Sequence, residues 1–61
     1  MAAGSQRRFD VFSVLHAASS MALDAVRAED DPADERLVAG LEDIVKVTLG
    51  ELERLAASRS R

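Results

Sequence analysis

The chain has 61 residues, a net charge of −3 at pH 7, no cysteine, and two phenylalanines as its only large aromatic residues. A chain of this length buries only about 60% of the surface that it exposes when unfolded, so small proteins usually need disulfides, a structural metal or a partner subunit. The composition excludes disulfides, and His16 is the single histidine. We therefore expect a partner chain to complete the core. The negative net charge argues against broad nucleic-acid binding.

The first half of the chain is patterned as a helix. We expect residues 1–5 to form a flexible leader and a helix to follow over residues 6–29, because no Pro or Gly interrupts that segment and Ser5 suits the N-cap. At about 100° per residue, the polar residues of this helix gather on one narrow face. They are Asp10, Ser13, His16, Ser20 and Asp24.

The remaining surface of this first helix is apolar and wider than one neighbouring helix covers. We expect its centre to pack against the second helix of the chain and one of its edges to contact a partner chain. The expected hairpin core on this helix comprises Val11, Ala18, Ala22 and Ala25. The edge expected at the interface with a partner comprises Phe9, Phe12, Leu15, Leu23 and Val26.

A turn is expected at residues 30–31 and a second helix over residues 32–57. Asp31 suits the N-cap, and Pro32 suits the first helical position because that residue needs no hydrogen-bond donor. The apolar residues of this helix recur at alternating spacings of three and four, as in coiled coils. The expected hairpin core on this helix comprises Val38, Leu41, Val45, Leu52 and Leu55.

Such a short turn forces the two helices to lie antiparallel. The predicted fold is therefore all-α: a single helical hairpin over residues 6–61. We expect this hairpin to pair with a second copy as a dimeric four-helix bundle. Docking onto the helical surface of a larger protein is the alternative way to cover the same apolar area.

Catalytic and cofactor-binding patterns are absent from the sequence. Asp10, Ser13 and His16 include the residue types of nucleophilic catalysis, but they share one helix face without oxyanion donors or pocket walls. His16 also has no further ligands at metal-binding spacing. We therefore predict no catalytic residues, no enzyme activity, no cofactor and no metal site.

Arginines are expected to gather at the open end of the hairpin, since antiparallel folding brings the start of the first helix beside the end of the second. They are Arg7, Arg8, Arg54 and Arg59. One interpretation is a contact with an anion or nucleic acid. The other is ordinary matching of positive side chains to the negative end of a helix dipole, together with solubility.

The longest uncharged run, residues 11–23, is too short and too polar to predict a membrane span. Arg7 and Arg8 before this run also fit a signal peptide, but cleavage near Ala22 would leave too few residues for a stable domain. The absence of cysteine fits a reducing compartment. We therefore expect a cytoplasmic protein without a membrane partner.

The functional prediction follows from the surplus of apolar surface. We expect a small non-catalytic protein–protein interaction module, either self-associating or an accessory subunit of a larger complex. The alternative is a dimeric helical-bundle regulator that contacts nucleic acid through its arginine-rich end.

Overall fold

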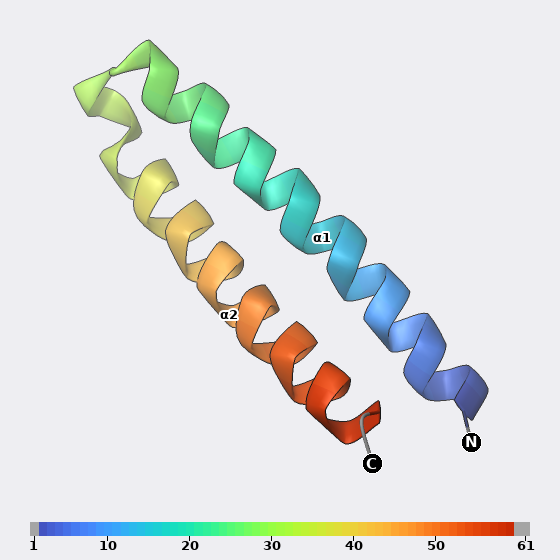
Figure 1. Cartoon of the computed structure of the whole chain (residues 1–61). Helices are drawn as coiled ribbons and strands as arrows, with labels where there is room; N and C mark the ends of the chain where they lie inside the picture. The colour runs from blue at the N-terminus through green and yellow to red at the C-terminus, as the bar shows by residue number, and fades with distance from the viewer. Residues whose placement is uncertain (1, 60–61) are drawn as a thin grey trace.

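The computed structural model describes the backbone of residues 2–59 and the side chains of residues 6–59. Helix α1 spans Ala2–Glu29, a short 3₁₀ helix η1 spans Pro32–Asp34, and helix α2 spans Glu35–Arg59. Figure 1 shows α1 and α2 as antiparallel neighbours, with the start of α1 and the finish of α2 at the same end. The predicted all-α hairpin is confirmed.

Helix α1 is longer than the sequence pattern predicts, whereas α2 begins and ends later than predicted, because residues 32–34 form the 3₁₀ helix η1. Helix α1 already begins at Ala2, so most of the expected leader is helical, and α2 continues to Arg59. Alanine is the best helix former and accounts for two of the added N-terminal residues. Met1 of the expected leader and residues 60–61 lie outside the described residues.

The turn between the helices depends on two neighbouring aspartates. Asp30 has a φ of 51°, in the left-handed region, and its N–H donates to the Arg27 carbonyl at 3.1 Å, which closes α1. Asp31 is extended, and its side chain accepts a hydrogen bond from the Ala33 N–H at 2.9 Å. Pro32 then occupies the first helical position. The turn thus ends one helix and begins the next within a few residues.

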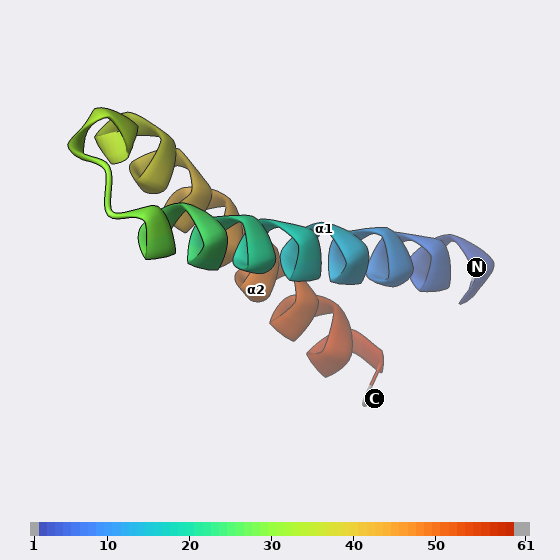
Figure 2. The same ribbon diagram turned by 90° about the horizontal axis from the view of Figure 1, so that it is seen from above.

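The two helices meet along a row of residues that we call the inner seam. On both helices its members alternate at spacings of three and four, which keeps them on one helical face. On α1 the inner seam comprises Phe9, Phe12, His16, Ser19, Leu23 and Val26. On α2 it comprises Val38, Leu41, Val45, Thr48, Leu52 and Leu55. All twelve are buried or half-buried, and Figure 2 shows that the helices cross at an angle along this contact.

The middle of the inner seam is polar. The Thr48 hydroxyl donates to the Ile44 carbonyl at 2.7 Å, so it accepts from the His16 Nδ1–H at 2.8 Å. The Ser19 hydroxyl donates to the Leu15 carbonyl at 2.7 Å. Thr48 is 2% exposed and Ser19 is 5% exposed. Among the described side chains, every buried polar atom has a hydrogen-bond partner, which makes this polar centre compatible with burial.

The structure reverses the orientation that the sequence analysis expected for α1. The predicted core residues Val11, Ala18, Ala22 and Ala25 are exposed. The predicted partner contacts Phe9, Phe12, Leu23 and Val26 lie in the inner seam instead, and of that set only Leu15 is exposed. The physical reason is size, because the bulky residues of α1 recur at the spacing that matches the large residues of α2. The polar residues between them are satisfied, since His16 bonds to Thr48 and Ser19 to a backbone carbonyl.

Helix α1 is also more apolar along its length than the uncharged run indicates. By length and composition alone, Gln6–Glu29 is suited to cross a membrane, and only 11% of its most apolar stretch is buried within the chain. The sequence-based exclusion of a membrane span is therefore too strict. Signal sequences and core helices of soluble proteins share this composition, so the finding marks a helix whose apolar surface is largely uncovered.

Candidate interaction surface

A second row of residues lies beside the inner seam, and we call it the lateral seam. Each member precedes an inner-seam residue by one position, which turns it by about 100° around the helix. On α1 the lateral seam comprises Val11, Leu15, Ala18, Ala22 and Ala25, and on α2 it comprises Leu37, Gly40, Ile44 and Val47. All nine residues are exposed. Sequence reasoning missed this row as a unit, although its alternating spacing is present in the sequence.

The lateral seams of the two helices face the same side of the hairpin. They enclose a shallow groove of about 260 Å³ at mid-length, lined by Phe12, Leu15, Asp43, Ile44, Val47 and Thr48. Leu15 is 44% exposed, Ile44 40% and Val47 66%. Asp43 is the only charged residue that lines this groove. At mid-length the two helices therefore share one apolar surface rather than presenting two separate stripes.

The total exposed surface is large for the mass of the chain. It amounts to 4776 Å² for 6.6 kDa. A typical folded monomer of that mass exposes roughly 3,900 Å². Within the described side chains, Leu23 and Leu55 are the only apolar residues that are buried, each 6% exposed. The hairpin alone therefore covers little of its apolar area.

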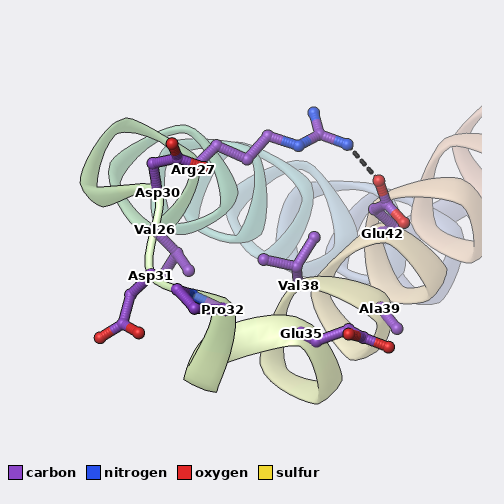
Figure 3. A pocket seen from close by; sticks show the side chains of 9 residues that line it. All are labelled: Val26, Arg27, Asp30, Asp31, Pro32, Glu35, Val38, Ala39 and Glu42. Atoms are coloured by element: carbon purple, nitrogen blue, oxygen red, sulfur yellow. Dashed lines mark hydrogen bonds and ion pairs between the residues drawn. The ribbon is translucent and has the colours of Figure 1, made fainter.

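A larger and more polar hollow lies beside the turn. It has a volume of about 600 Å³ and combines apolar residues such as Val26 and Val38 with several carboxylates. Figure 3 shows Arg27 of α1 reaching across it to form an ion pair with Glu42 of α2. Within the described residues, no group of three or more His, Asp or Glu side chains is placed to hold a metal ion.

Arginines at the open end of the hairpin are engaged within the chain. Arg54 donates two hydrogen bonds to the Glu51 carboxylate, at 2.9 and 2.7 Å, and Arg8 of α1 approaches the same carboxylate at 2.8 Å. The hydrogen bonds from Arg54, followed by the charges of Arg54 and Arg8, lower the pKa of Glu51, and the same bonds raise the pKa of Arg54. The Arg59 guanidinium lies 5.3 Å from the centre of the Phe9 ring. Arg7 is exposed.

Two of the residues considered for nucleophilic catalysis, His16 and Asp10, form hydrogen bonds with other side chains. The His16 ring bonds to Thr48 across the inner seam rather than to a serine hydroxyl. Asp10 is exposed and accepts a hydrogen bond from Gln6 at 3.0 Å. Neither of these two hydrogen bonds joins a serine hydroxyl to the His16 imidazole.

Fold and surface together define a small two-helix hairpin that exposes an apolar groove at mid-length. Comparisons with protein-family models, curated proteins and solved structures find no match to this chain.

Proposed function

We propose that the protein is a small non-catalytic protein–protein interaction module, and that helices of another polypeptide cover its lateral seam. The observation that carries this proposal is the exposure of all nine lateral-seam residues on one side of the hairpin. Monomeric soluble proteins rarely leave such a continuous apolar surface open, and surfaces of this kind mark interaction sites. The covering helices belong either to a second copy, as in a dimeric four-helix bundle, or to a larger protein that uses this chain as an accessory subunit.

The composition of the inner seam supports the same proposal. Three of its central positions are occupied by His16, Ser19 and Thr48, whose hydrogen bonds make burial tolerable but contribute little net stability, about 1 kcal/mol each. Burial of apolar area is the main stabilising term in folding. Association through the lateral seam adds the apolar burial that the hairpin lacks.

The arginine-rich end supports nucleic-acid binding as the second candidate function. Arg7, Arg8, Arg54 and Arg59 share that end of the hairpin, which is the arrangement that phosphate contacts require. Arg8 and Arg54 already share the Glu51 carboxylate, so their charge is partly neutralised within the chain. For this reason we favour the interaction module.

Sedimentation of the purified chain over a wide concentration range tests the proposed function. We expect a mass above that of the monomer, with dissociation and loss of helical content occurring together on dilution. If the purified chain is monomeric, co-purification of a defined protein that covers Leu15 and Ile44 against solvent labelling would support the accessory-subunit form. A fully helical, stable monomer that binds no protein would contradict the proposal. Salt-sensitive binding of RNA by that monomer would instead favour the second candidate.

A further inference from the structure

We propose that a second copy of this chain occupies the lateral seam, in antiparallel orientation, on a twofold axis that passes through Ala18 and between Ile44 and Val47. The proposal rests on the proposed function and names the partner and its geometry. Four observations support it: the angle between the seams, the sizes of the lateral-seam residues, the charges at the two ends and the exposed area.

The angle between the two seams matches a four-helix bundle. Each helix of such a bundle contacts two neighbours, at directions separated by roughly a right angle. The lateral seam lies about 100° around each helix from the inner seam, because its members precede those of the inner seam by one residue. Both seams also keep the alternating spacing of three and four that packed helices share. A helix pair seated on the lateral seam therefore completes a bundle.

Residue sizes along α1 favour the antiparallel orientation. With the axis at Ala18, Val11 packs against Ala25 of the partner subunit, and Leu15 packs against Ala22 of the partner subunit. Large side chains thus meet small ones, which lets two helices approach closely without voids. A parallel dimer would instead set Ala25 against Gly40 of the partner subunit, small against small, and leave a gap.

Charge favours the same orientation. Residues 27–36, around the turn, include five acidic and two basic side chains, whereas the open end has four arginines in residues 6–10 and 51–59 and three acidic residues. An antiparallel dimer sets the acidic turn of one copy beside the arginine-rich end of the other. A parallel dimer would bring two acidic turns together, and like charges side by side are destabilising.

The exposed area of the chain leaves enough surface for a stable dimer contact. The chain exposes about 900 Å² more than a typical folded monomer of its mass, and a standard interface buries about 800 Å² on each partner. The groove at the centre of the lateral seam supplies the apolar part of such an interface. A second copy provides a partner whose surface has the same length and pattern.

Glutamate substitutions on opposite sides of the hairpin test the surface. Leu15→Glu and Ile44→Glu each bury a charge at the proposed contact, and we expect each to weaken dimerisation at least about 100-fold. Leu49→Glu is the matched control, because Leu49 is 46% exposed but follows Thr48 and so lies on the other side of α2. Met21→Glu, at a residue 72% exposed on the outer face of α1, is the second control. We expect both controls to stay within about threefold of the unmodified protein.

Distances between spin labels test the orientation without altering the interface. The chain contains no native cysteine, so Ala33→Cys places a single label at the exposed turn. The hairpin is 45 Å long, and an antiparallel dimer separates its two turns by a distance of about that length. A parallel dimer brings them within roughly half of it. Ala17→Cys, at mid-length on the outer face, reports dimer formation in either orientation.

The possible results separate this inference from the proposed function. Long turn-to-turn distances together with dissociation by Leu15→Glu and Ile44→Glu establish the antiparallel lateral-seam dimer. Short distances, or dissociation by Met21→Glu alone, overturn this geometry while leaving self-association intact. A labelled protein that stays monomeric and instead binds neutral phospholipid vesicles through α1 overturns both.

Discussion

The hydrogen bond between His16 and Thr48 is the most enclosed polar contact of the hairpin. It joins the two helices at 2.8 Å, and Thr48 is 2% exposed. We expect His16→Ala and Thr48→Val each to destabilise the fold by about 1 kcal/mol, because each removes the hydrogen bond that joins these side chains across the two helices. The double variant should cost less than the sum, since replacing both partners leaves no unpaired group.

Urea denaturation at one fixed protein concentration measures this coupling. Thr48→Ser is the control, because it keeps the hydroxyl that His16 donates to. Strict additivity of the two single replacements would show that the contact contributes nothing beyond the packing of the separate side chains.

Two adjacent aspartates in the turn are predicted to have opposite effects on stability. Asp30 adopts a left-handed conformation at the negative end of α1, so both its backbone and its charge are unfavourable there. Asp30→Gly is therefore expected to stabilise the fold by up to about 1 kcal/mol. Asp31 caps the next helix through the Ala33 N–H, and Asp31→Ala is expected to cost about 1 kcal/mol. Equal changes of the same sign in thermal melts would contradict this assignment of roles.

At the level of helices, the Glu51 carboxylate near the end of α2 forms an ion pair with Arg8 near the start of α1. Hydrogen bonds from Arg54, together with the charge of Arg8, lower the pKa of Glu51 in the folded chain. A lowered folded-state pKa stabilises the fold at pH above the ordinary glutamate value of about 4.3 and loses that effect as the pH falls below it. We therefore expect Glu51→Gln to destabilise the fold at neutral pH and to match the unmodified protein near pH 3.

Denaturation curves at a series of pH values test this expectation. Glu53→Gln is the charge-matched control, because Glu53 is exposed in the same turn of the helix. A Glu51→Gln variant whose difference from the unmodified protein is the same at acid and neutral pH would exclude a role for the ionised carboxylate.

The two helices differ in how far their packing follows from sequence. The residues expected to form the core of α2, such as Val38 and Leu41, do lie in the inner seam, because a narrow apolar stripe leaves only one face to bury. Helix α1 is apolar over most of its circumference, so the positions of its apolar residues do not show which face packs against α2. The spacing of Phe9, Phe12 and Leu23 does mark the face that packs against α2. His16 and Ser19 lie on that same face, however, and polar residues of this kind are expected in solvent.

The lateral seam shows the same limit of sequence reasoning. Leu37 and Ile44 are easily assigned to the main stripe of α2, because they neighbour it on the helix. Only the structure shows that Ile44 lines a groove together with Leu15. A residue that lies one position from a core residue is turned by about 100°, which decides whether it is buried or available to a partner.

For the whole molecule, dimerisation predicts that stability depends on protein concentration. Mass action then raises the free energy of unfolding by about 1.4 kcal/mol for each tenfold increase in concentration. We expect Tm to rise by several degrees over that increase, measured by circular dichroism. The Ile44→Glu variant should lose this dependence, and the Leu49→Glu variant should keep it. A constant Tm for the unmodified chain would place its full stability within one hairpin.

The polar centre of the hairpin also limits the sliding of one helix along the other. Two alanine-rich helix surfaces slide along each other easily, since a displacement of one turn, about 5.4 Å, replaces each small residue with another. The inner seam opposes such a displacement, because it would separate the His16 imidazole from the Thr48 hydroxyl and break their hydrogen bond. This hydrogen bond near mid-length, together with the short turn and the Arg8–Glu51 ion pair, therefore fixes the alignment of the two helices and of the residues that the lateral seam presents to a partner.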